Sequence, residues 1–174
     1  MATSKIIIIR GPICSGKTTT INLLKDKFDN ASYIDFDAFK RAIDWTKPSP
    51  WRTELAFKSA LNLAEELMKR GRNILADIHS SKKYQYQAYK ELAEKYNYDF
   101  HSFLLYPPLH VCLCRNLNRE IPDVKYKVTE KEIIDYWQET FKITGEDVFN
   151  TANIEIQDII KFIFNKVNNN FSAI

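Results

Sequence analysis

The sequence has few cysteines, little net charge and no long hydrophobic run. Its 3 cysteines, Cys14, Cys112 and Cys114, include no C-x-x-C pair, which excludes a disulfide framework and a zinc site and favours a reducing, cytoplasmic location. The longest aliphatic run, Ile6–Ile9, is far shorter than the roughly 20 apolar residues of a membrane helix, and no cleavage site follows it. We therefore expect neither a membrane span nor a signal peptide. The net charge of +3 is too small to indicate a dedicated DNA-binding surface.

Glycine is also scarce, and its placement indicates where a site lies. Two of the 4 glycines, Gly11 and Gly16, lie close together just after the first apolar run. The length of 174 residues, with 45% hydrophobic and 27% charged residues, predicts one compact globular domain that spans residues 1–174.

Segments typical of strands alternate with helical patterns along the chain. Residues 4–10 form an unalternating β-branched run, as expected of a strand buried on both faces. The alternation predicts an α/β three-layer sandwich, in which a five-stranded parallel sheet carries helices on both faces. Further strands are expected at 32–37, 73–77, 100–105 and 147–149, and helices at 16–28, 38–41, 55–68, 84–96, 109–119, 129–142 and 154–167.

The segment from Gly11 to Thr18 reads Gly-Pro-Ile-Cys-Ser-Gly-Lys-Thr and matches the phosphate-binding pattern G-x-x-x-x-G-K-[ST] in full. It follows a predicted strand and opens a helix, so backbone N–H groups and the helix dipole converge on a bound phosphate. We therefore expect a P-loop NTPase fold, with Lys17 at the β- and γ-phosphates of ATP and Thr18 at Mg²⁺. The predicted nucleotide-binding residues are Gly11, Pro12, Ile13, Cys14, Ser15, Gly16, Lys17, Thr18 and Thr19.

The motifs of two other P-loop classes are missing. There is no guanine-reading N-K-x-D motif, since Asn165-Lys-Val-Asn168 lacks the aspartate, and no D-x-x-G follows a switch strand. A large mechanical ATPase needs an extended second half, for which 174 residues leave no room. The small phosphotransferases remain as the class that fits.

Three aspartates lie where the second and third strands are expected to end. Asp35 and Asp37 alternate within 32–37, so we predict that both face the same side, where one can deprotonate an acceptor hydroxyl. Asp77 ends the third strand and is a candidate Mg²⁺ ligand. The alternatives are helix caps or turn formers for Asp35 and Asp37, and a buried structural carboxylate for Asp77.

Two arginines, Arg115 and Arg119, lie one helical turn apart, so both guanidiniums are expected on the same face of a helix. Two guanidiniums aimed at one place suit an anion such as a transferring phosphoryl group. The alternative is an exposed helix face on which they pair with acids such as Glu120.

Residues beyond the second strand are candidates for binding the acceptor. Trp51 and Arg52 can stack on and pair with a base, a sugar or an aromatic acceptor, or they can pack the segment from Trp45 to Arg52 on the body. His79 can contact the substrate or serve the fold. The predicted acceptor-side residues are Asp35, Lys40, Arg41, Trp51, Arg52 and His79.

The sequence resembles the small P-loop kinase superfamily, in particular the group of polynucleotide 5′-hydroxyl kinase, chloramphenicol phosphotransferase and the zeta-toxin-type kinases. The matching segments are the P-loop, residues 34–41, the strand that ends at Asp77, and Arg115–Arg119. The resemblance implies that the first strand lies between the third and fourth, and that a small helical lid spans approximately residues 115–130. The roles that it implies are a general base at Asp37, a phosphate contact at Lys40, clamps on the ATP phosphates at Arg115 and Arg119, and adenine near Asn150 and Thr151.

Together these features predict an ATP- and Mg²⁺-dependent phosphotransferase that moves the γ-phosphate to a hydroxyl of a small-molecule or nucleotide-like acceptor. Two alternatives stay open, a nucleotide-binding regulatory module with slow NTPase activity and a polynucleotide 5′-hydroxyl kinase. A nucleic-acid end is the less favoured acceptor, and no membrane partner is expected. The predicted catalytic residues are Asp37, Lys17, Arg115 and Arg119, and the predicted metal ligands are Thr18 and Asp77.

Overall fold

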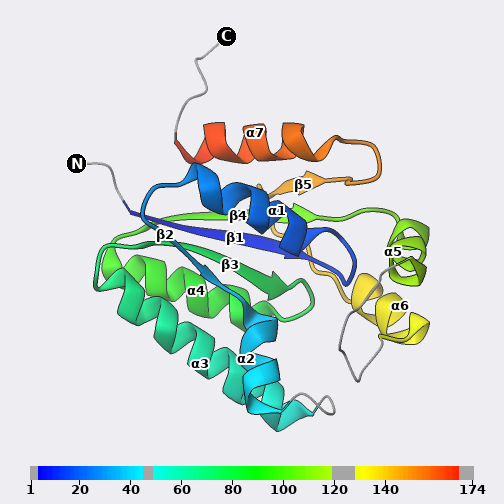
Figure 1. The fold of residues 1–174 in the computed structure, drawn as a ribbon, viewed down its shortest axis with the longest axis horizontal. Coiled ribbons are helices and arrows are strands. Elements are labelled where there is room, and N and C mark those ends of the chain that lie inside the picture. The colour runs from blue at the N-terminus through cyan, green and yellow to red at the C-terminus, as the bar shows by residue number, and fades with distance from the viewer. Residues whose placement is uncertain (1–3, 45–48, 119–127, 169–174) are drawn as a thin grey trace.

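A parallel sheet forms the centre of the protein. The computed structural model describes residues 4–44, 49–118 and 128–168. The strands are β1 (Lys5–Gly11), β2 (Ala31–Ile34), β3 (Asn73–His79), β4 (Asp99–Leu105) and β5 (Asp147–Phe149). They are all parallel and lie in the order β2-β3-β1-β4-β5 (Figure 1). The predicted place of the first strand, between the third and the fourth, is confirmed.

Helices cover both faces of this sheet. They are α1 (Lys17–Leu24), α2 (Phe36–Ile43), α3 (Pro50–Met68), α4 (Lys83–Tyr96), α5 (Leu109–Leu117), α6 (Glu130–Gln138) and α7 (Ile156–Val167), and a 3₁₀ turn, η1 (Lys25–Lys27), follows α1. In Figure 1, α1 and α7 lie above the sheet and α3 and α4 below it, which confirms the three-layer sandwich. None of the helices in the described ranges is long and apolar enough to span a bilayer.

The two faces of β1 belong to two separate hydrophobic clusters. Ile6 and Ile8 pack with side chains of α2, α3 and α4 in one cluster, and Ile7 and Ile9 pack with those of α1 and α7 in the other. All four isoleucines are fully buried. Successive side chains of a strand point to opposite faces, so burial on both sides explains why the apolar run does not alternate.

Several element boundaries differ from the prediction, and one of them affects the site. The prediction of a strand over 32–37 is wrong at its end, because β2 stops at Ile34 and Asp35 is the N-cap of α2. The Asp35 carboxylate accepts a hydrogen bond from the Ala38 N–H at 2.9 Å, which favours the helix. Helices α1, α5, α6 and α7 are shorter than their predicted ranges, whereas α2, α3 and α4 begin before theirs, α3 already at Pro50. Caps and 3₁₀ turns set such ends, and apolar spacing does not mark them.

Helices α5 and α6 lie together beyond the carboxyl ends of the strands (Figure 1, right). The Trp137 ring of α6 stacks on Tyr106 with a centroid distance of 4.9 Å, and its Nε1 donates to the Pro107 carbonyl oxygen at 2.9 Å. These contacts fix the end of α6 to the segment between β4 and α5. The lid predicted at about 115–130 falls mostly on residues 119–127, which lie outside the described residues. Arg119, the second predicted arginine, is one of them.

Candidate active site

The P-loop connects the buried end of β1 to the start of α1. Gly16, at the N-cap of α1, has a φ of 103°, a backbone conformation that favours glycine. The Lys17 Nζ donates to the carbonyl oxygens of Gly11 and Pro12 at 3.0 and 2.9 Å. Burial lowers the pKa of Lys17, while the nearby carboxylates of Asp77 and Asp37 act in the opposite direction. Lys17 is therefore a half-buried side chain held against the loop carbonyls, and two nearby acids act on its pKa.

Gly11 is required at its place by close packing. A Cβ built there would lie 2.3 Å from the Ser15 Oγ and 2.5 Å from the backbone oxygen of Leu105, which cannot rotate away. We predict that Gly11→Ala lowers the free energy of unfolding by about 1–3 kcal/mol, because the loop or β4 must shift. The measurement is urea unfolding, with Gly71→Ala as the control.

The Gly71 control separates crowding from backbone strain. A Cβ at Gly71 would meet nothing within 4 Å, although its φ of +71° is strained for alanine. Gly71→Ala should therefore cost about 1–2 kcal/mol without altering the P-loop. If Gly11→Ala and Gly71→Ala lost equal free energy of unfolding and equal nucleotide affinity, close packing would not be the reason for glycine at position 11.

Asp35 and Asp37 do not form the predicted pair on one side of a strand, because the helix starts between them. Besides capping α2, the Asp35 carboxylate accepts a hydrogen bond from the Arg41 Nη2 at 3.3 Å. The helix-cap alternative describes Asp35, and its partner Arg41 lies six residues further along α2. Both side chains are thus engaged with each other at the surface.

Asp37 lies in the first turn of α2 with its carboxylate open to solvent. Its side chain is 64% exposed and accepts from the Lys40 Nζ at 3.0 Å. Desolvation acts to raise the pKa of Asp37, but Lys40, Lys17 and His79 outweigh it and hold that pKa below its usual value. The result is an ionised, accessible carboxylate whose electrostatic partners include the P-loop lysine.

Asp77 is a buried acid in the last part of β3. It is 8% exposed, and the Tyr33 hydroxyl donates to its Oδ1 at 3.5 Å. Burial raises the pKa of Asp77 to about 6, although Lys17 lowers it, and Asp37 and Asp35 raise it further. A buried carboxylate beside other acids is a position at which a cation is favourable.

His79 ends β3 and its ring packs against α6. The ring centroids of His79 and Tyr136 are 4.2 Å apart at an angle of 42°. No described residue forms a hydrogen bond with the buried Nδ1 of His79. Burial, helped by Lys17 and Lys40, lowers the pKa of His79 to about 3, so the imidazole is neutral at neutral pH. The structure thus places a neutral histidine with an unused ring nitrogen at the edge of the sheet where Asp37 and Lys17 act on it.

Arg115 reaches from α5 to the back of the P-loop. Its Nη1 donates to the Thr151 hydroxyl at 2.9 Å and to the carbonyl oxygens of Cys14 and Ser15, both at 3.4 Å. Its Nη2 donates to the Thr151 carbonyl oxygen at 2.8 Å, and the Thr151 hydroxyl donates to the Ser15 carbonyl oxygen at 3.1 Å. The guanidinium therefore joins α5, the P-loop and the segment after β5.

The remaining acceptor-side candidates lie at the start of α3. Trp51 is 56% exposed. Arg52 donates from Nη1 to the Asp44 carbonyl oxygen at 2.6 Å and so connects the start of α3 with the end of α2. Trp45 lies outside the described residues. Trp51 presents an exposed ring, whereas Arg52 is bonded to the backbone.

The sequence interpretation missed one group beside the P-loop, the side chain of Arg10. It is fully buried and forms an ion pair with Glu146 at 2.8 Å, between side chains that are 0% and 2% exposed. A charged residue directly after four buried isoleucines was the available signal, since a charge inside a sheet requires a partner. The partner is remote in sequence, so spacing could not identify it.

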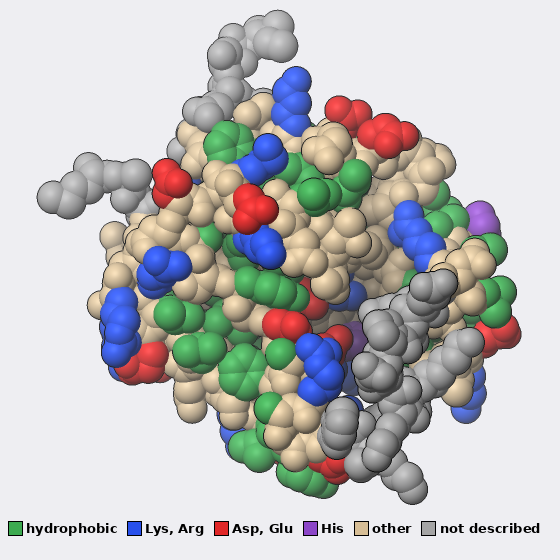
Figure 2. Space-filling view, in the orientation of Figure 1, with side chains coloured by type: hydrophobic (Ala, Val, Ile, Leu, Met, Phe, Trp, Pro, Cys, Tyr) green, Lys and Arg blue, Asp and Glu red, His purple; other side chains and the backbone are tan. Residues whose placement is uncertain are grey.

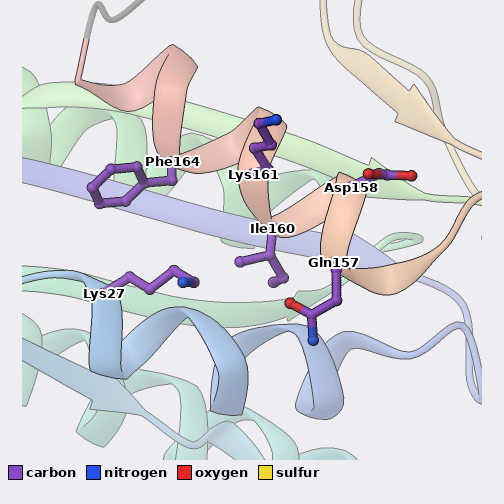
Figure 3. Close-up of a pocket in the computed structure, with 6 residues that line it drawn as sticks. All are labelled: Lys27, Gln157, Asp158, Ile160, Lys161 and Phe164. Carbon is purple, nitrogen blue, oxygen red and sulfur yellow. The ribbon is translucent and has the colours of Figure 1, made fainter.

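The face of the molecule shown in Figure 2 carries charged side chains. Figure 2 shows acidic and basic side chains gathered near the middle of the viewed face, around a recess. A separate cavity of about 470 Å³ lies between η1 and α7 (Figure 3), and none of the predicted site residues lines it. Its lining residues are Lys27, Gln157, Asp158, Ile160, Lys161 and Phe164.

A family match covers most of the chain, including the site. The model of the AAA domain family AAA_33 matches residues 6–143, a range that contains the P-loop, Asp37, Asp77 and Arg115. The chain belongs to this AAA domain family. No match to the sequence of this AAA domain was found among curated proteins.

Solved structures share the fold of this AAA domain. A sugar kinase from Janibacter sp. HTCC2649 is 14% identical, with a TM-score of 0.71 and coverage of 95% of both chains. The APS kinase of Mycobacterium tuberculosis, in complex with AMPPNP and APS, is 13% identical, with a TM-score of 0.66 and coverage of 97% of this chain and 99% of that one. A chain of the Pnkp1/Rnl/Hen1 RNA repair complex is 20% identical, with a TM-score of 0.69. The match covers 80% of this chain and 45% of that one. The predicted P-loop kinase fold is confirmed.

Proposed function

We propose that this AAA domain is an ATP- and Mg²⁺-dependent phosphotransferase that moves the γ-phosphate of ATP to a hydroxyl of a small-molecule or nucleotide-like acceptor. The observation that carries the proposal is Asp37, an ionised and accessible carboxylate whose pKa Lys17 helps to lower. Phosphoryl transfer needs positioning, charge stabilisation and a carboxylate that accepts the hydroxyl proton. Lys17 supplies the charge stabilisation, and Asp37 supplies the carboxylate.

The nucleotide side follows from the P-loop. Backbone N–H groups of the residues from Gly11 to Thr19, Pro12 excepted, hold the phosphates, and Lys17 exchanges its two loop carbonyls for the β- and γ-phosphates. Thr18, exposed in the first turn of α1, and the buried Asp77 fit Mg²⁺, which keeps several waters and needs few protein ligands. The metal, when bound, neutralises charge on the phosphates.

Arg115 is proposed to hold the nucleotide by organising the back of the P-loop. We predict that Arg115→Met weakens ATP binding about tenfold, since charge-assisted hydrogen bonds to Thr151 and the loop carbonyls are lost. The measurement is a calorimetric titration with ATP and Mg²⁺. Arg70→Met removes an exposed arginine in the turn that follows α3 and should leave the affinity unchanged. An unchanged affinity in Arg115→Met contradicts the role.

The acceptor side is proposed around Asp37. Lys40 lies beside Asp37, and its Nζ is 4.2 Å from the centroid of the Phe36 ring. The unused His79 Nδ1 offers a hydrogen bond to an acceptor group, and the exposed Trp51 ring offers a surface for stacking. Arg41 and Arg52 are engaged with Asp35 and the Asp44 backbone, and we propose that they shape this side.

Transfer of label from γ-labelled ATP to a panel of acceptors tests the proposal. The panel contains nucleosides, amino-sugar nucleotides, aminoglycoside and phenicol drugs, simple sugars and 5′-hydroxyl oligonucleotides. Label on one class, dependent on Mg²⁺, supports the phosphotransferase and identifies its acceptor. Binding of ATP with label released only to water supports the regulatory NTPase alternative and contradicts the proposal.

A nucleic-acid acceptor is the second candidate, and the likeness to a chain of an RNA repair complex favours testing it. The exposed Trp51 ring suits a base, but the net charge of +3 is only a small positive surplus for binding a phosphate backbone. A polynucleotide 5′-hydroxyl kinase should bind 5′-hydroxyl oligonucleotides with an affinity that falls as salt rises.

A further inference from the structure

Arg10 is a fully buried cation one residue before the P-loop. Its Nε and Nη2 donate to the two carboxylate oxygens of Glu146, each at 2.8 Å, and the Ser102 hydroxyl donates to the Glu146 Oε1 at 2.5 Å. A bidentate geometry with an added hydrogen bond offsets the desolvation of both charges.

The same guanidinium holds the segment that follows α6. The Arg10 Nη2 also donates to the Phe141 carbonyl oxygen at 2.8 Å, and the guanidinium lies 4.1 Å from the centroid of the Phe141 ring. The Phe141 N–H donates to the Ser80 carbonyl oxygen at 3.2 Å, and the Ser80 and Thr140 hydroxyls are 2.7 Å apart. Residues 140–141 are thereby tied both to the end of β1 and to the residue after β3.

From this anchor the contacts continue to the acceptor side. The Thr140 hydroxyl donates to the Tyr136 carbonyl oxygen at 3.0 Å, and the Tyr136 ring packs on His79. The buried Nδ1 of His79 has no hydrogen-bond partner in the part of the chain that the structure describes. The path from Arg10 through Phe141 and Thr140 to Tyr136 is continuous: Phe141 and Thr140 are joined by a peptide bond, and the other steps are hydrogen bonds.

We infer that the Arg10–Glu146 ion pair is a positioning device that holds α6 with Tyr136 on His79 and so sets the shape of the acceptor side. Arg10 lies behind the P-loop, bonded to Glu146 and Phe141, and acts through these residues without touching either substrate. The functional part of this inference rests on the proposed phosphotransferase. The positional part concerns the free protein and can be tested without any acceptor.

Hydrogen exchange of the free protein tests the positional part. Removing one charge leaves the other buried and unpaired, so Glu146→Gln alone can unfold the chain, whereas the double variant Arg10→Met/Glu146→Gln removes both charges. In the folded double variant we expect amide exchange in α6 and at residues 140–141 to be at least tenfold faster, with α7 unchanged. The near-UV circular dichroism of the stacked Trp137 and Tyr106 should also weaken.

A second ion pair near β5 provides the matched control. Lys166 and Asp147 join α7 to β5 but have no contact with residues 140–141 in the described structure, and Lys166→Met/Asp147→Asn should leave exchange in α6 unchanged. Unchanged exchange of α6 in Arg10→Met/Glu146→Gln would overturn the inference. Equal acceleration in α6 and α7 would overturn it as well, because it indicates general loosening.

Kinetics with γ-labelled ATP test the functional part, using the acceptor that the wild-type protein labels. We expect Arg10→Met/Glu146→Gln to raise the KM for that acceptor about tenfold and to leave the KM for ATP unchanged. An equal rise in both KM values contradicts a role confined to the acceptor side. If the wild-type protein labels no acceptor, the proposed function fails, and the exchange experiment still decides whether Arg10 positions α6.

Discussion

Asp37→Asn is expected to abolish most phosphoryl transfer while leaving ATP binding intact. The carboxylate is the group proposed to accept the hydroxyl proton, and loss of a general base lowers a rate by about 10²–10⁴-fold. The carboxamide has nearly the same shape, and the ion pair with Lys40 is exposed on the Asp37 side, so folding should change little. The measurements are the initial rate of label transfer and the dissociation constant of ATP.

Two control variants, Asp26→Asn and Asp35→Asn, show whether a loss of transfer is specific to Asp37. Asp26→Asn changes an exposed aspartate of η1 and should alter neither rate nor affinity. Asp35→Asn removes the acceptor of the Ala38 N–H and the partner of Arg41, so a loss of helix stability is expected there. If Asp35→Asn lost transfer and Asp37→Asn kept it, the assignment of Asp37 as the base would be wrong.

Lys17→Ala is expected to reduce both ATP affinity and transfer, in contrast to Asp37→Asn. The Lys17 Nζ donates to two carbonyl oxygens of the P-loop, and removal of one preorganised group that stabilises transition-state charge costs about 10²–10³-fold in rate. Its loss also leaves Asp77 and Asp37 without a cation that now acts on both. The measurements are again the transfer rate and the ATP dissociation constant, with thermal unfolding as a check on folding.

Lys25→Ala is the matched control, since Lys25 is an exposed lysine at the end of the same helical segment. It should leave affinity, rate and unfolding temperature unchanged. Full transfer by Lys17→Ala would contradict the role of Lys17. An equal loss of transfer in Lys17→Ala and Lys25→Ala would contradict it as well.

The parts of the fold that follow from local pattern were predictable. Four consecutive isoleucines in β1 indicated a strand buried on both faces, and the glycines and Lys17 located the turn into α1. The sheet order followed from the resemblance and not from the pattern. The end of β2 was not predictable from alternation, because the capping bond of Asp35 stops the strand at Ile34 and only the folded backbone reveals it.

The site was predictable only in part, for a physical reason. Asp77 and His79 could be placed at a strand end from spacing, but their burial, which moves both pKa values, depends on α6 and on the P-loop. The contacts of Arg10 with Glu146 and of Arg115 with Thr151 join residues 136 and 36 positions apart. Such pairs arise from tertiary packing, and a single sequence contains no periodicity that marks them.

The most direct test of the central claim is a single-turnover reaction, with the protein in excess over γ-labelled ATP and the acceptor panel pooled. The fate of each γ-phosphate is then counted as organic phosphate ester or as inorganic phosphate. The account predicts that most of the label reaches an organic hydroxyl, that Lys17→Ala and Asp37→Asn both lose this product, and that Asp26→Asn retains it. Label found only in inorganic phosphate, or ATP left unbound, would contradict it.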